Sequence, residues 1–219
     1  MNLLSDVRDH IEQARDVSGR ATDVPWASFA EFLRSRVYDP QLATRHALTF
    51  CDDDRALRRT YTYAELGAIV ERLAGVFHTR FGLTRGDRAA TLLFNHDVTV
   101  LTYLAAWTLG VAVVPINIEE TPDKKRYILE HSEVSTVFCW QDGYEELCAL
   151  QSDIATLREV IALGDGGVLD NHRTGKKFHA HGAGRSLRRS PFTSGLDDHA
   201  LIVYTSGTTG PPKGVILTV

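Results

Sequence analysis

The sequence has few cysteines and no excess of positive charge. Only three of its 219 residues are cysteine, and their odd number and wide spacing suit neither a disulfide framework nor a metal site. The formal net charge of −4 provides no general attraction to nucleic acid or to an anionic membrane. These shortages indicate a cytoplasmic protein without a metal site and without nucleic acid as a partner.

The chain also lacks a convincing secretory signal. Charged residues, among them Asp6, Arg8 and Glu12, interrupt any apolar core near the start. The apolar residues there recur at roughly helical spacing instead. We therefore expect residues 1–24 to form an amphipathic helix that leads into the domain.

The longest uncharged run, residues 98–118, is long enough to cross a membrane. Gly110 and Pro115 interrupt it, and three threonines dilute it. A buried helix over 97–109, followed by a strand over 111–116 that is covered on both faces, explains the run better than a membrane span.

Short apolar runs alternate with helical periodicity along most of the chain. Strands are predicted over 47–50, 60–63, 89–94, 111–116, 134–140 and 159–163, and helices over 26–37, 66–81, 97–109, 121–130 and 144–150. Thr62 and Glu65 have capping-box spacing at one helix start, and Gly82 is placed to end that helix. Thr121 followed by Pro122 is typical of another helix start. The alternation predicts an α/β fold with a doubly wound, mostly parallel sheet flanked by helices.

Residues 164–198 differ in composition from the rest. Six lysines and arginines and no acid lie between Asn171 and Ser190, together with His172, His179 and His181. A metal-binding tract or a polyanion-binding arm would need acids, cysteines or interleaved aromatic residues, which this stretch lacks. We expect a flexible, solvated loop that leads to a strand at Leu201.

The most informative stretch is residues 201–217, in which a strand, a loop over 204–214 and a return strand follow one another. Glycines let backbone N–H groups approach an anion closely, hydroxyls add donors, and Lys213 adds a point charge. The candidate phosphate-binding residues are Thr205, Ser206, Gly207, Thr208, Thr209, Gly210 and Lys213. Clusters of this composition are commonly ordinary turns. A Walker loop is excluded because Gly214, not Ser or Thr, follows Lys213.

The ordered string from Tyr204 to Val215, YTSGTTGPPKGV, resembles the phosphate loop of adenylate-forming enzymes. These include acyl-CoA synthetases, luciferases and the adenylation domains of peptide synthetases. Two weaker matches agree with it: TYAEL from Thr62, and LGVAVVPIN from Leu109, whose final asparagine resembles acyl-CoA ligases. The resemblance implies that residues 25–219 are part of an N-terminal adenylation domain.

By this resemblance, the protein would activate a small-molecule carboxylic acid with ATP and Mg²⁺ as an acyl-adenylate. The acyl group would then pass to a thiol such as coenzyme A. The candidate residues 205–210 and Lys213 would hold the ATP phosphates. The identity of the acid, the choice between coenzyme A and a carrier thiol, and the oligomeric state stay open.

In the family, the segments that follow this loop supply a glutamate box, a ribose-binding aspartate and a catalytic lysine. We therefore assign no catalytic residue within the chain, expect such residues downstream of Val219, and expect these 219 residues to be inactive by themselves. A partial domain should also expose an apolar face. The alternative is a non-catalytic module that binds a nucleotide or a partner, for which the basic segment is the one favourable feature.

Overall fold

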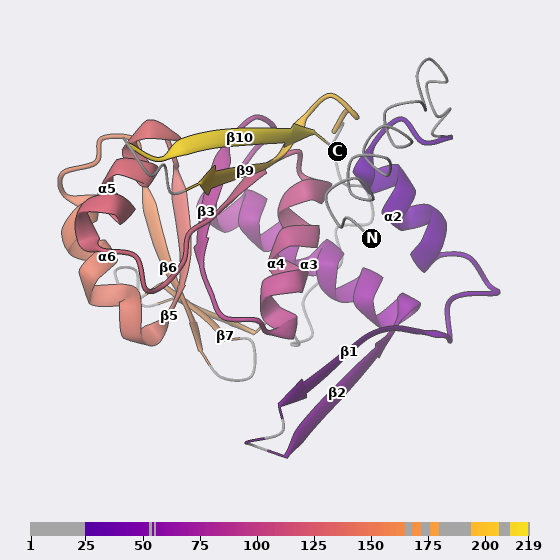
Figure 1. The fold of residues 1–219 in the computed structure, drawn as a ribbon. Helices are drawn as coiled ribbons and strands as arrows, with labels where there is room; N and C mark the ends of the chain where they lie inside the picture. The colour runs from indigo at the N-terminus through magenta and orange to yellow at the C-terminus, as the bar shows by residue number, and fades with distance from the viewer. Residues whose placement is uncertain are drawn as a thin grey trace, which may run out of the picture.

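The structure is a computed structural model, and it describes residues 25–52, 54, 56–164, 168–171, 176–179, 194–205 and 211–218. The helix expected within residues 1–24 lies outside these ranges. Figure 1 shows a central sheet with helices on both faces and a small hairpin that projects from this body.

The central sheet has eight strands in the order β10-β9-β4-β3-β5-β6-β7-β8. The middle five are parallel to one another, and the pairs at both edges are antiparallel. The strands are β3 (Arg88–Leu92), β4 (Ala112–Pro115), β5 (Thr136–Trp140), β6 (Glu159–Gly164), β7 (Val168–Asn171), β8 (Lys176–His179), β9 (His199–Thr205) and β10 (Lys213–Thr218).

Helices cover both faces of this sheet. One apolar cluster contains side chains of α2 (Phe29–Val37), α3 (Tyr63–Phe81) and α4 (Asp97–Thr108), and the other contains side chains of α5 (Pro122–His131) and α6 (Tyr144–Gln151). A short 3₁₀ helix, η1 (Gln141–Gly143), precedes α6. The doubly wound, mostly parallel α/β fold predicted from the sequence is thereby confirmed.

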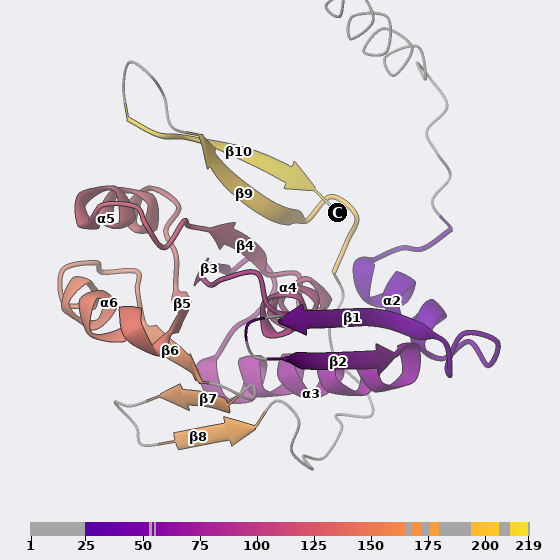
Figure 2. The ribbon, with the colours of Figure 1, turned by 60° about the horizontal axis from the view of Figure 1, so that its bottom comes forward.

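The first two strands form a separate antiparallel hairpin, β1 (His46–Asp52) with β2 (Leu57–Thr62). In Figure 2 this hairpin lies over α3. Tyr61, at the inner end of β2, is buried against the first core cluster.

The predicted helix ends are present. Thr62 accepts from the Glu65 amide at 3.3 Å, and Glu65 accepts from the Thr62 amide at 2.9 Å, so both halves of the capping box form at α3. Gly82 ends α3 with a φ of 67°, a left-handed conformation that suits glycine. Thr121 caps α5 by accepting from the Lys124 amide at 3.4 Å.

The long uncharged run divides as expected into helix α4 and strand β4, with Gly110 between them. Strand β4 is buried from Ala112 to Val114 because helices cover both of its faces. Within the described ranges, no helix is long and apolar enough to cross a membrane.

The prediction of a loop throughout residues 164–198 was wrong at two places. β7 pairs antiparallel with β6, and β8 pairs with β7, so this segment extends the sheet. Each strand has four residues and lies among glycines and basic residues, a composition that favours a loop. Their backbone groups pair because β6 would otherwise present an unpaired edge, a condition that the local sequence does not reveal.

Candidate nucleotide site

The carboxyl ends of the parallel strands define one edge of the sheet. Chain order reverses across β3: β4 lies on one side of it, and β5 and β6 lie on the other. The loops after β3 and β5 therefore lead to helices on opposite faces, which creates a crevice between them. Open α/β sheets bind ligands at such an edge.

Thr205 and Lys213, the first and last of the candidate phosphate-binding residues, lie at this edge. Thr205 is the last residue of β9, which runs parallel to β4, and Lys213 is the first residue of β10. The two are register partners, so their side chains share one face of the hairpin, and both are exposed. The other candidates, Ser206, Gly207, Thr208, Thr209 and Gly210, lie outside the described residues.

Gly214 leaves room for a neighbouring side chain to pack. It pairs with Tyr204 across the hairpin, and a Cβ at this glycine would lie 3.1 Å from Cζ of the Tyr204 ring. Tyr204 therefore lies against the bare backbone of β10. Its hydroxyl is 2.7 Å from Nδ1 of His131, the last residue of α5, so the end of β9 is tied to the neighbouring helix.

A hollow of about 530 Å³ lies at the crevice between β3 and β5. It is lined by the segments that follow β3 and β5 and by the ends of β1 and β6: Phe50, Cys51, Asp52, Phe94, Asn95, His96, Trp140, Gln141, Asp142, Leu163 and Gly164. Neither Thr205 nor Lys213 lines it, so the hollow and the hairpin are separate features of one edge.

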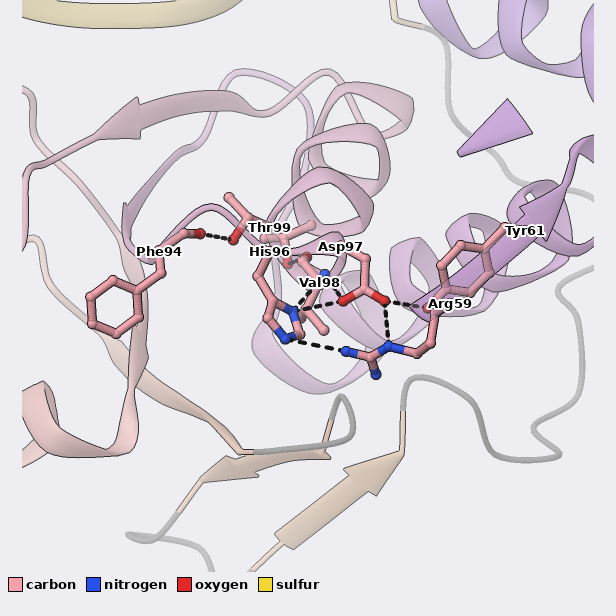
Figure 3. A network of polar contacts seen from close by, with 8 residues as sticks. Arg59, Tyr61, Phe94, His96, Asp97, Val98 and Thr99 are labelled. Atoms are coloured by element: carbon pink, nitrogen blue, oxygen red, sulfur yellow. Dashed lines mark hydrogen bonds and ion pairs between the residues drawn. The ribbon is translucent and has the colours of Figure 1, made fainter. Parts of the chain in front are cut away.

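A buried polar network supports one wall of this hollow. Asp97 is 1% exposed at the start of α4, and its carboxylate accepts from Tyr61 and from the Val98 amide at 2.8 Å, while Nδ1 of His96 lies 2.6 Å from it. Nε of Arg59 lies 3.0 Å from the same carboxylate. Figure 3 shows these side chains converging on Asp97. Burial raises the pKa of Tyr61, and the adjacent Asp97 raises it further.

Both ring nitrogens of His96 are engaged within the network. Nη2 of Arg59 lies 3.2 Å from Nε2 of His96. Nδ1 of His96 lies 2.6 Å from the Asp97 carboxylate and accepts from the Val98 amide at 3.2 Å. A catalytic Asp–His pair would direct an available Nε2 at its substrate, whereas here a guanidinium occupies Nε2. The network therefore holds β2 against α4 and is not a catalytic pair.

Sequence analysis did not single out Arg59, His96 or Asp97. They lie on two elements, and no motif spacing connects residue 59 with residues 96 and 97. A buried aspartate at a helix start also has the same sequence signal as an ordinary helix cap.

Magnesium has no carboxylate cage in the part of the chain that the structure describes. No group of three or more histidine, cysteine, aspartate or glutamate side chains occurs there in a metal-binding arrangement. A Mg²⁺ ion at this site would therefore take most of its ligands from the nucleotide phosphates and from water, and few from the described residues.

Comparisons with known proteins agree with this geometry. Over 163 residues the chain is 29% identical to crotonobetaine/carnitine–CoA ligase of Salmonella paratyphi B, an alignment that covers 73% of this chain and 31% of the relative. The ATP-bound structure of MatB from Rhodopseudomonas palustris matches with a TM-score of 0.69 and 28% identity, over 87% of this chain and 34% of that one. A fatty acyl CoA synthetase of Mycobacterium tuberculosis matches with a TM-score of 0.68 and 26% identity, again over 87% and 34%.

The chain thus spans about a third of the length of these relatives. The family model described as AMP-binding enzyme matches residues 41–219, which include both strands of the β9–β10 hairpin and the loop between them. Because this match covers most of the sequence, the chain belongs to the AMP-binding enzyme family.

Proposed function

We propose that this chain is the ATP-phosphate-binding portion of an AMP-forming carboxylate–CoA ligase. Thr205, Ser206, Gly207, Thr208, Thr209, Gly210 and Lys213 would hold the β- and γ-phosphates of ATP while a carboxylate attacks the α-phosphate. The names of the relatives, ligases and synthetases that form CoA esters, support coenzyme A as the acceptor.

One observation carries the proposal. Thr205 and Lys213 are register partners at the carboxyl edge of the parallel sheet, so the loop between them begins and ends at one place. A hydroxyl and an ammonium group on one exposed face there can both address a polyanion. Because charge develops on the departing pyrophosphate, donors and a cation that are already in place favour the transition state.

The described residues bind and orient; none of them is assigned a proton transfer. Lys213 would neutralise phosphate charge, and the Thr205 hydroxyl would donate to a phosphate oxygen. Mg²⁺ would supply further charge neutralisation on the phosphates.

We propose that turnover requires the portion of the family domain that these 219 residues lack. The hairpin has the exposed apolar surface expected of a partial domain: Val215 and Leu217, on one face of β10, are 49% and 48% exposed, and Ile216, on the other face, is 52% exposed. In a full-length protein, further chain would cover that surface.

The test is ATP binding measured by calorimetry, together with acid-dependent ATP–pyrophosphate exchange. The 219-residue chain should bind ATP but should not catalyse exchange with any acid of a broad panel. Lys213→Ala should weaken ATP binding by about tenfold, the loss of one charge-assisted contact. Lys124→Ala, at a surface lysine paired with Glu120, is the matched control and should bind as the wild type does.

Three results would contradict parts of the proposal. If the wild type shows no ATP binding, the phosphate-binding assignment is wrong. If exchange proceeds with these residues alone, the requirement for the rest of the family domain is wrong. If Lys213→Ala leaves ATP binding unchanged, the phosphates bind somewhere other than the β9–β10 hairpin.

A further inference from the structure

The strand that carries the phosphate loop has little support from the sheet ladder. β9 shares a single register pair with β4, Val113 with Leu201, whereas β5 and β6 share five. Its other neighbour, β10, belongs to the same hairpin at the edge of the sheet. Figure 2 shows this hairpin at the edge opposite β7 and β8. Contacts outside the ladder therefore help to place β9: Ile202 is buried in the second apolar cluster, Tyr204 near the end of the strand contacts His131, and a charged pair lies at its start.

The residue immediately before β9 is held by a bidentate ion pair. Arg85, in the turn after α3, donates from Nε to both oxygens of Asp198 at 2.9 and 3.1 Å and from Nη2 at 2.7 Å. These residues are 113 positions apart in sequence. The Gly195 amide donates to the same carboxylate at 2.9 Å. We call this arrangement of Arg85 and Asp198 the clasp.

Two glycines, Gly110 and Gly195, leave room for the clasp because they have no side chain. Gly110 has a φ of +71°, and a Cβ there would lie 2.9 Å from both Cγ of Arg85 and Oδ2 of Asp198. A Cβ on Gly195 would lie 3.0 Å from Nη2 of Arg85. A larger residue at either position would collide with the ion pair, so the local backbone is fitted to it.

A second contact acts at the same end of β9. Nε1 of Trp107, on α4, donates to the carbonyl of Ala200 at 2.7 Å.

Partial burial by itself would raise the pKa of Asp198, but the hydrogen bonds from Arg85 and Gly195 and the charge of Arg85 outweigh it and lower that pKa. Asp198 is therefore a carboxylate at neutral pH and is available to Arg85.

From these contacts we infer that Arg85 and Asp198 are positioning residues for the phosphate site: the clasp fixes the start of β9 and thereby the place of Thr205 and Lys213. The inference rests on the proposed function, in which those two residues bind ATP phosphates. A strand transmits position along its length because its ends are joined by a continuous extended backbone.

The clasp should act on position more than on global stability. Arg85 has 52% of its side chain exposed, and ion pairs that are this open contribute little to the free energy of unfolding. Its loss should therefore loosen the hairpin without lowering the melting temperature appreciably. That separation makes the inference testable.

The first experiment is hydrogen–deuterium exchange on the 219-residue chain. In Arg85→Ala and in Asp198→Asn, amides of β9 and β10 should exchange about fivefold or more faster than in the wild type, with β5 and β6 unchanged. Arg158→Ala is the matched control, because its ion pair with Asp87 has similar exposure, 54% and 24%, and touches neither strand of the hairpin. If exchange in the hairpin stays at the wild-type rate in both clasp variants, the inference is overturned.

The second experiment measures ATP affinity on the same proteins, below the melting temperature of each. Either clasp variant should weaken ATP binding by about five- to tenfold, the double variant no further, and Arg85→Lys by less. Arg158→Ala should bind as the wild type does. Equal affinity in wild type and clasp variants would overturn the inference, even with a loosened hairpin. If the wild type binds no ATP, the proposed function fails, and with it the positioning of a phosphate site, whereas hydrogen exchange still reports whether the clasp holds β9.

Discussion

Arg59 and Asp97 form an ion pair in which the carboxylate is fully buried. Nε of Arg59 lies 3.0 Å from the carboxylate of Asp97, whose side chain is 0% exposed. The pair joins β2 to the start of α4 across 38 residues of sequence. Hydrogen bonds from Tyr61 and the Val98 amide add to it, and His96 lies in contact with the same carboxylate. A buried charge of this kind is costly to leave without its partner.

Removing one partner should therefore destabilise the fold. Arg59→Met should lower the free energy of unfolding by about 3 kcal/mol, because it leaves a buried carboxylate without its cation. The double variant Arg59→Met with Asp97→Asn should be less destabilised than the sum of its single variants. Urea unfolding followed by tryptophan fluorescence measures both effects. Arg58→Met, at an exposed neighbour on the same strand, is the control, and an equal loss there would refute the argument.

The pKa of Asp198 predicts a pH dependence of stability. Its pKa is lowered in the folded protein, so folding favours its charged form, and this contribution is complete above the unfolded value of about 3.9 and is lost as pH falls through the lower folded value. The stability difference between the wild type and Asp198→Asn, which should be small because Arg85 is 52% exposed, should be constant from neutral pH to about pH 5 and should shrink as the pH falls below about 4. Urea unfolding at several pH values checks this. A difference that persists unchanged at about pH 3 would show that the ion pair is not its source.

The three thiols should differ in reactivity. Cys51 is exposed, Cys148 is half-buried, and Cys139 is buried, and burial together with the nearby Cys148 raises the pKa of Cys139 to about 12. Since the thiolate is the reactive form, Cys139 should react with a disulfide reagent about a thousandfold or more slowly than Cys51. The absorbance of the thiol released from the reagent follows the reaction, and each class of cysteine should give its own kinetic phase. Cys51→Ser should abolish the fast phase, and urea should make the remaining thiols reactive; a fast phase that survives this substitution would contradict the assignment.

The apolar face of the hairpin should make the isolated chain self-associate. Val215 and Leu217 lie on one face of β10 and are 49% and 48% exposed. Replacing both by threonine keeps β-propensity and removes apolar surface, so it should reduce association with a change in unfolding free energy within about 1 kcal/mol. Sedimentation at several concentrations measures the effect. Val100→Thr, at a valine on α4 that is 40% exposed, should leave association unchanged. If this variant and the hairpin double variant associate equally, the hairpin is not the surface through which the chain self-associates.

Much of the fold could be predicted from local sequence, because the signals are local in physical origin. The capping box at Thr62 and Glu65 is a set of hydrogen bonds among four consecutive residues, and it formed as predicted. The division of the long uncharged run at Gly110 likewise follows from the conformational freedom of one residue, whose φ is +71°. The structure places Thr205 and Lys213 opposite each other in the β9–β10 hairpin, while the assignment of Thr205, residues 206–210 and Lys213 to phosphate binding stays a prediction.

Pairings between distant segments could not be predicted in this way. Strands β7 and β8 form because the edge of β6 accepts them. The Arg59–Asp97 network and the Arg85–Asp198 clasp join segments 38 and 113 residues apart. Local propensity and periodicity do not report which residues far apart in the sequence come into contact. The sequence by itself thus determined most of the element types, the class of sheet and the family motif. The tertiary structure alone decided the pairing of β7 and β8 and which distant charges meet, since burial and proximity exist only once the chain is folded.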